Sequence, residues 1–141
     1  MTTGHQPANS ETGFPLGLHI AAVLTLIMTY RVTPIFLMSE VGGTIPEFWG
    51  VAFRGDIFIG ITAPIVAWLL WRKQGLAVWT VAIVWQFIGI KDFLTGLEFH
   101  FIQPFDPSMG SIPIVLLGGG PLVHLVAVYL LIKHRSHYLN R

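Results

Sequence analysis

Four long apolar stretches, separated by short polar ones, dominate the pattern of this chain. They run from about residue 15 to 38, 53 to 71, 76 to 97 and 112 to 133. Each holds close to the roughly 20 mostly apolar residues that a helix needs to cross a hydrocarbon core about 30 Å thick. Since backbone groups in lipid find no water to bond, each stretch is expected to be helical. The pattern predicts an all-α fold, a bundle of four transmembrane helices.

The segments outside these stretches are short and polar. We expect residues 1–14 to be a flexible N-terminal tail, residues 15–133 a single transmembrane domain, and residues 134–141 a basic tail. The N-terminal tail contains no Lys or Arg, whereas a secretory signal needs a basic region before its apolar stretch. The first apolar stretch is therefore expected to be kept as a helix.

Composition agrees with this picture and excludes several classes of site. Charged residues make up 11% of the chain, against about 25% in soluble domains, so a water-facing surface is not expected. The first predicted partner is therefore the lipid bilayer. The net charge of +1 gives no sign of a nucleic-acid partner. The absence of cysteine excludes disulfides, thiolate metal sites and cysteine nucleophiles.

Basic residues outside the apolar stretches predict the orientation. Arg72 and Lys73 lie between the second and third stretches, and Lys133, Arg135 and Arg141 lie at the C-terminal end. An even number of spans puts both regions, and the N-terminus, on one side. Because loops rich in Lys and Arg stay in the cytoplasm, both termini are predicted to be cytoplasmic.

Three charged residues inside the apolar stretches are predicted to lie at one depth. Counting about 1.5 Å per residue from the span ends puts Arg31, Asp56 and Asp92 roughly 5–6 Å below the outer edge of the hydrocarbon. Buried charges in a membrane tend to face the interior and pair, and the planar fork of Arg31 offers enough donors to bridge both acids. The set is either a structural lock or an outward-facing polar pocket. The spare carboxylate of a pocket is protonated or binds a cation or amine.

Small residues accompany the two acids. Asp56 shares a helix face with Gly60, and Asp92 shares one with Gly89. Small side chains let membrane helices approach closely. The second and third spans are therefore predicted to form a tight antiparallel hairpin.

The motif "GGGP" interrupts the fourth span. Gly119, Gly120 and Pro121 lie near the predicted midplane, where a broken helix often marks a binding site but is also tolerated without one. His124 follows one turn later. It has four candidate roles: a hydrogen bond to a backbone carbonyl freed by Pro121, a ligand contact, a proton relay or a haem ligand.

Cofactors are left open by the sequence. A haem held by two histidines would use His19 with His124, whose predicted distances from the cytoplasmic edge are about 6 and 12 Å. Haem and quinone are the cofactors considered. Glu98, His100 and Asp106 match no metal-binding spacing, so no metal site is predicted.

Two segments, "GDIFIGITAPIVAWLLWR" and "GIKDFLTG", carry a resemblance. With Pro121 followed by His124, they are similar to a loose group of small, uncharacterised bacterial integral membrane proteins. The likeness covers residues 50–130 approximately. It implies a four-helix membrane fold and a multi-pass protein of a bacterial inner membrane, with no activity attached.

For function, we expect a binding protein or accessory subunit for a lipophilic ligand or membrane partner, either as a homo-oligomer or within a larger complex. Two alternatives are a small oligomeric transporter and a membrane enzyme acting on a lipid or quinone. No nucleophile elbow, phosphate loop or zinc-protease motif is present, which favours a role other than catalysis.

The predicted orientation has a direct test. A reporter active only in the cytoplasm should give signal when fused after residue 74 or at the C-terminus, and none when fused near Pro107. The reverse pattern would overturn the orientation and move the charged layer to the inner leaflet.

Overall fold

The computed structural model describes residues 14–33, 50–102 and 120–139, and these residues are mostly helical with no strand among them. The elements in chain order are α1 (Leu16–Ile27), the 3₁₀ turn η1 (Met28–Val32), α3 (Gly50–Arg72), α4 (Leu76–Ile102), α6 (Gly120–Lys133) and α7 (Ser136–Leu139). The prediction of an all-α chain is therefore confirmed for the described ranges.

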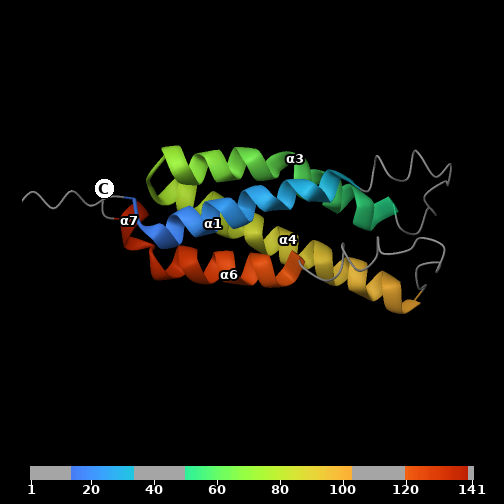
Figure 1. Ribbon diagram of the computed structural model, residues 1–141. Helices are drawn as coiled ribbons and strands as arrows, with labels where there is room; N and C mark the ends of the chain where they lie inside the picture. The colour runs from blue at the N-terminus through green and yellow to red at the C-terminus, as the bar shows by residue number, and fades with distance from the viewer. Residues whose placement is uncertain (1–13, 34–49, 103–119, 140–141) are drawn as a thin grey trace, which may run out of the picture.

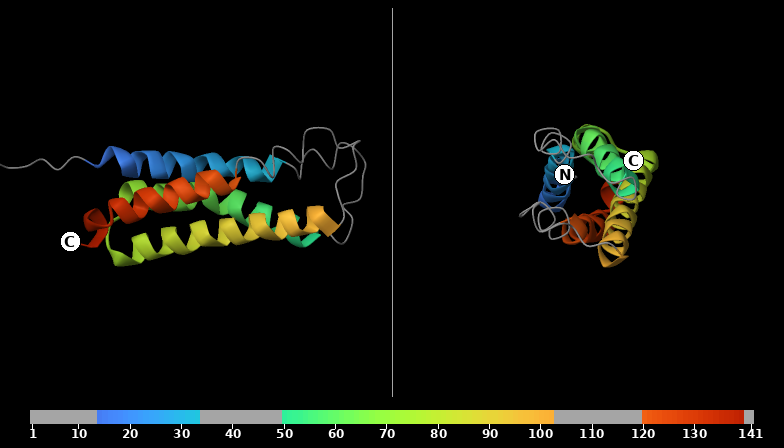
Figure 2. Two further views of the ribbon diagram at one scale, coloured as in Figure 1. Left: turned by 90° about the horizontal axis from the view of Figure 1, so that it is seen from below. Right: turned by 90° about the vertical axis from the view of Figure 1, so that its right-hand side faces the viewer.

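The long helices lie side by side around one centre. α1 packs against α3 and α6, and α4 packs against the same two helices, which puts α1 and α4 on opposite corners. Figure 1 shows the helices running lengthwise together, and the end-on view of Figure 2 shows them surrounding a common axis. Every long helix therefore presents one face to the same interior.

The observed helices correspond to the predicted spans with different ends. α3 and α4 contain the second and third stretches, and α4 continues five residues further, to Ile102. Residues 34–38 and 112–119, predicted as parts of the first and fourth spans, lie outside the described residues. Phe53–Arg72 and Leu76–Ile102 are long and apolar enough to cross a membrane, whereas Leu16–Val32 and Gly120–Lys133 are shorter apolar helices.

Small side chains fill the contacts between helices. Ala63 and Ala67 of α3, Ala82 of α4 and Ala127 of α6 are fully buried. Large apolar side chains point outward from the same helices and stay exposed, among them Phe58, Ile61, Ile65, Phe87 and Leu125. A soluble domain buries such side chains, so the outer surface of this chain is unusually apolar.

The C-terminal segment closes one end of the molecule. α7 folds back so that Tyr138 is fully buried, and its hydroxyl donates to the Leu70 carbonyl over 2.9 Å. Burial raises the pKa of Tyr138 to about 12, so the hydroxyl keeps its proton in neutral solution. The Leu70 carbonyl lies in the last turn of α3, where carbonyl groups have no N–H partner within the helix, and Tyr138 supplies that partner. α7 thus fixes the end where α3 turns into α4.

Candidate functional site

Arg31 lies between two carboxylates in the interior. Its Nε is 2.6 Å from Oδ1 of Asp56, and its Nη2 is 2.8 Å from Oδ2 of Asp92. Arg31 is 3% exposed, and Asp56 7%. The three residues come from η1, α3 and α4, as their shared depth predicts, so the predicted contact of Arg31 with both acids is confirmed.

Two glycines make room for this cluster. A Cβ on Gly60 would lie 2.8 Å from the Val32 backbone nitrogen, so the missing side chain lets η1 approach α3 closely. A Cβ on Gly55 would overlap the carboxylate of Asp92, so this glycine admits the acid from α4. The charged groups therefore occupy space that only glycine leaves free.

The two ion pairs differ in hydrogen bonding. Nη2 of Arg31 donates a hydrogen bond to Asp92, whereas the contact of Nε with Asp56 lacks hydrogen-bond geometry and is held by charge. Nη1 of Arg31 is buried and has no hydrogen-bond partner within the described part of the chain. With both acids ionised, the cluster carries one negative charge in excess, together with an unused donor.

A second polar group links three helices deeper in the interior. The hydroxyl of Thr25 donates to the Ala21 carbonyl over 2.8 Å, and Gln86 donates from Nε2 to that hydroxyl over 2.9 Å. Oε1 of Gln86 then lies 2.5 Å from Nδ1 of His124. Since this oxygen only accepts, Nδ1 must carry the proton. In neutral His124, Nε2 is therefore the atom with the lone pair.

His124 completes this group with one nitrogen unused. The residue is fully buried, and its Nε2 has no hydrogen-bond partner among the residues that the structure describes. A Cβ on Gly89 would overlap the imidazole ring, so this glycine provides the space for the ring. The partner of Nδ1 is the side chain of Gln86, whereas the carbonyl that Pro121 would free, at residue 117, lies outside the described residues.

Gln86 is the residue that sequence reasoning missed. It is fully buried in α4, six residues before Asp92, which is about 9 Å along the helix. Thr25 precedes Arg31 by the same six residues. The signal was a lone amide in the middle of an apolar stretch, since such a group needs a partner in lipid. The interior thus has two polar levels, one at Arg31 and one at Gln86.

The "GGGP" motif is described only in part. Gly119 lies outside the described residues, whereas Gly120 and Pro121 begin α6. Proline is tolerated in the first turn of a helix because its missing N–H has no helical partner there. Gly120 is buried, and a Cβ on it would meet no atom of the described residues within 4 Å. It lies one turn before His124 on α6.

The predicted haem pair is not brought together. His19 is exposed and its ring contacts Phe14 at 4.5 Å between centroids, whereas the ring of His124 lies 5.5 Å from that of Trp85 in the interior. Across the described ranges, no group of three or more His, Asp or Glu side chains is arranged to hold a metal ion.

Breaking one ion pair should strongly reduce stability. Arg31→Met should lower the free energy of unfolding in detergent by about 3–5 kcal/mol, as in soluble analogues, because two carboxylates lose their partner. Asp56→Asn should lower it less, because Arg31 keeps Asp92. The double variant should lose less than the sum of the single losses, because Asp56 then carries no charge to be left unpaired. Thermal unfolding measures this, and strictly additive losses would contradict the pair.

Two glycines should respond differently to alanine. Gly89→Ala should displace His124 and lower the midpoint of thermal unfolding, because the new methyl group overlaps the ring. Gly120→Ala meets no atom of the described residues within 4 Å, so its midpoint should change less than that of Gly89→Ala. Equal shifts in the two variants would show that the ring does not need the space at Gly89.

No protein-family model, no curated protein and no solved structure matches this chain. Its role is therefore inferred from the geometry of the two polar levels.

Proposed function

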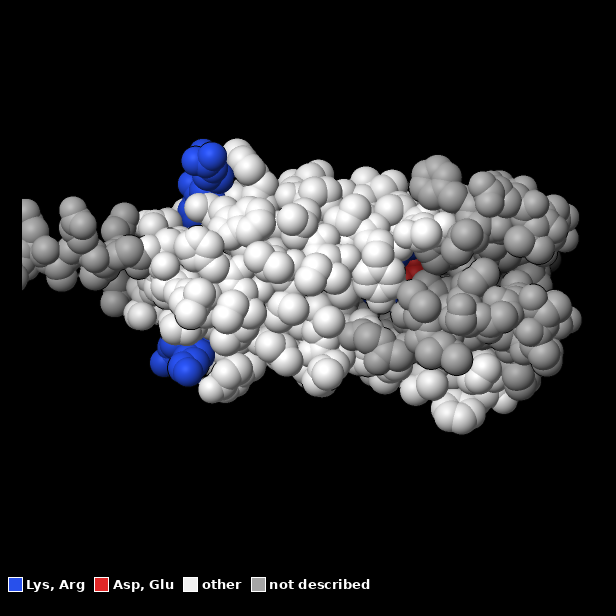
Figure 3. Space-filling model, viewed as in Figure 1, with Lys and Arg blue, Asp and Glu red and all other residues white. Residues whose placement is uncertain are grey.

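We propose that the chain is a four-helix, multi-pass protein of a bacterial inner membrane with both termini in the cytoplasm. Support comes from the two helices long and apolar enough to span a bilayer and from the large apolar side chains on the outer surface. Figure 3 adds the charge pattern. Basic side chains gather at the end where α3 and α6 finish, and the described surface beside them is uncharged over most of the length.

Within that setting, the role that we propose is binding. The protein holds a lipophilic ligand whose polar head reaches the interior near Arg31, and serves as a binding protein or accessory subunit of a membrane complex. The observation that carries this proposal is the excess of hydrogen-bonding and charged groups at Arg31, Asp56 and Asp92. A purely structural lock would leave no buried donor unused, since an unpaired polar group in an apolar interior is costly.

The unused atoms indicate the chemistry of the head group. Nη1 of Arg31 offers a donor, Nε2 of neutral His124 offers a lone pair, and one carboxylate charge is not balanced. A hydroxyl or neutral amine both accepts and donates hydrogen bonds, whereas an ammonium only donates them but balances the charge. We therefore expect an amphiphile with a hydroxyl or amine head, such as a quinol or an amino lipid.

The outer surface also fits partner subunits. Exposed Phe58, Ile61 and Ile65 lie on one helix, α3, where apolar side chains pack equally well against lipid or another membrane helix. The proposal therefore includes assembly as a homo-oligomer or in a larger complex.

Mass spectrometry of lipophilic molecules that co-purify in mild detergent tests the binding role. Asp92→Asn should reduce the amount of bound ligand about tenfold or more, because the variant removes the excess negative charge that attracts the head group. Glu98→Gln is the matched control, since Glu98 is an exposed acid on the same helix. It should leave the ligand in place.

Three results bear on the proposal separately. A folded Asp92→Asn variant that keeps its ligand would contradict a role for the cluster in binding. Wild-type protein without any bound amphiphile would contradict the binding function itself. Loss of ligand in both variants would show a general effect of charge on α4.

A further inference from the structure

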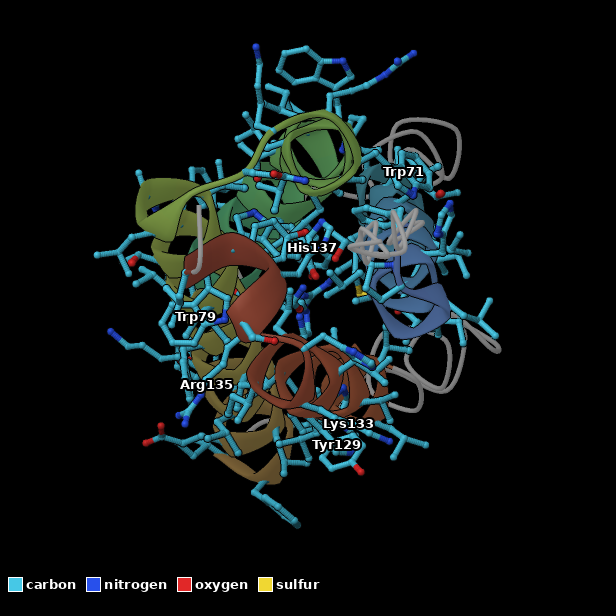
Figure 4. The ribbon with its side chains drawn as sticks, turned by 90° about the vertical axis from the view of Figure 1, so that its left-hand side faces the viewer. Trp71, Trp79, Tyr129, Lys133, Arg135 and His137 are labelled. Atoms are coloured by element: carbon cyan, nitrogen blue, oxygen red, sulfur yellow. The ribbon has the colours of Figure 1, made fainter. Side chains whose placement is uncertain are left out.

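The end of the molecule opposite the Arg31 cluster holds a second, unrelated set of side chains. A shallow depression of about 390 Å³ at this end, largely open to the outside and called the cavity below, is lined by Phe14, His19, Trp71 and Arg72. It lies between the start of α1 and the end of α3. Figure 4, which views this end directly, shows Trp71 beside α1.

The electrostatics of this end favour an anion. Arg72 lines the cavity, and Lys73, Lys133 and Arg135 lie at the same end of α3 and α6. The acidic residues within the described ranges are Asp56 near the start of α3 and Asp92 and Glu98 in the second half of α4, all away from this end. The start of α1 adds to the positive potential, because its first turn has no acidic residue and no side-chain cap.

The lining combines two chemistries in one place. Arg72 and the imidazole of His19 can donate hydrogen bonds, and a guanidinium matches the oxygens of a phosphate with its two parallel N–H groups. Phe14 and Trp71 provide flat apolar surface next to these donors. Tryptophan beside basic residues is typical of the depth where lipid headgroups meet acyl chains.

Neighbouring contacts hold the cavity in shape. The ring of Phe14 packs edge-on against His19 and against His137 of α7, with centroids 4.5 and 5.3 Å apart. His137 lies across the end of the molecule in Figure 4, and its Nε2 is 3.1 Å from the Gln74 amide. The wall formed by Phe14 is thus supported by the C-terminal helix, whose Tyr138 is anchored to α3.

From these observations we infer that the cavity binds the headgroup of an anionic phospholipid of the cytoplasmic leaflet. The phosphate is held by Arg72 and His19, and the glycerol and first methylenes lie against Trp71 and Phe14. The inference uses the membrane placement proposed above, but it is independent of the ligand at Arg31.

Native mass spectrometry of the full chain in neutral detergent tests this, with phosphatidylglycerol and phosphatidylcholine added in equal amounts. Wild-type protein should retain phosphatidylglycerol in preference. Arg72→Gln should weaken that retention about tenfold or more, since a charge-assisted hydrogen bond is lost. Lys73→Gln removes the same charge one residue away, outside the lining, and should weaken retention less than about fivefold.

A second pair of variants tests, by tryptophan fluorescence, whether the lipid binds in the cavity. Addition of phosphatidylglycerol should change tryptophan emission in the wild type and in Trp68→Phe, because Trp68 is exposed and not part of the lining. The change should disappear in Trp71→Phe. Asp92→Asn should retain phosphatidylglycerol normally, so a failure here is distinguishable from a failure of the proposed binding role.

Several results would overturn the inference. Equal retention of the two lipids would show that the site has no preference for an anionic lipid. Equal losses of retention in Arg72→Gln and Lys73→Gln would show that the preference comes from general surface charge and not from the cavity. Displacement of phosphatidylglycerol by millimolar inorganic phosphate would identify a site for free phosphate instead of a lipid.

Discussion

The cost of a charge in an apolar interior is the constraint on which this structure depends. Burying an ion without a partner costs several kcal/mol, because the charge loses its hydration. Arg31 offsets that cost by contacting carboxylates from α3 and α4. Because η1, α3 and α4 must all contribute, the ion pairs also fix the relative heights of these helices.

The same constraint explains the backbone. Charged and polar groups need space inside a bundle whose helices approach closely, and glycine supplies it at each polar level. Small residues elsewhere on α3 and α4 keep the helices close enough for the contacts to form. Packing and electrostatics therefore act together, since neither the pairing of Arg31 nor the ring position of His124 is compatible with a larger side chain opposite.

Much of this arrangement follows from the sequence, for a simple reason. Helices have a fixed rise per residue, so counting from the ends of the apolar stretches is enough to predict one depth for Arg31, Asp56 and Asp92. Spacing of three and four residues likewise puts Gly60 and Gly89 on the same helix faces as the acids, but it does not predict their neighbours, which are η1 for Gly60 and the ring of His124 for Gly89. The depth of a residue along its helix and the helix face on which it lies depend only on its position in the sequence, so both can be predicted from one chain.

The remaining features depend on which side chains meet across helices. The partner of His124 is Gln86 of α4. Counting depths along the helices can show that the two residues lie at a similar level. Whether His124 bonds a side chain or a backbone carbonyl also depends on how α4 and α6 are rotated about their axes. α7 was missed because four residues of a polar tail carry no periodic signal, and its order comes from the contact of Tyr138 with Leu70.

The glycines that touch polar side chains also restrict how this protein can change over generations. The carboxylate of Asp92 fills the volume beside Gly55, and the imidazole of His124 fills the volume beside Gly89. A larger residue at either glycine position becomes acceptable only when the group opposite shrinks. In related chains, positions 55 and 92, and positions 89 and 124, should therefore vary as matched pairs of constant summed volume.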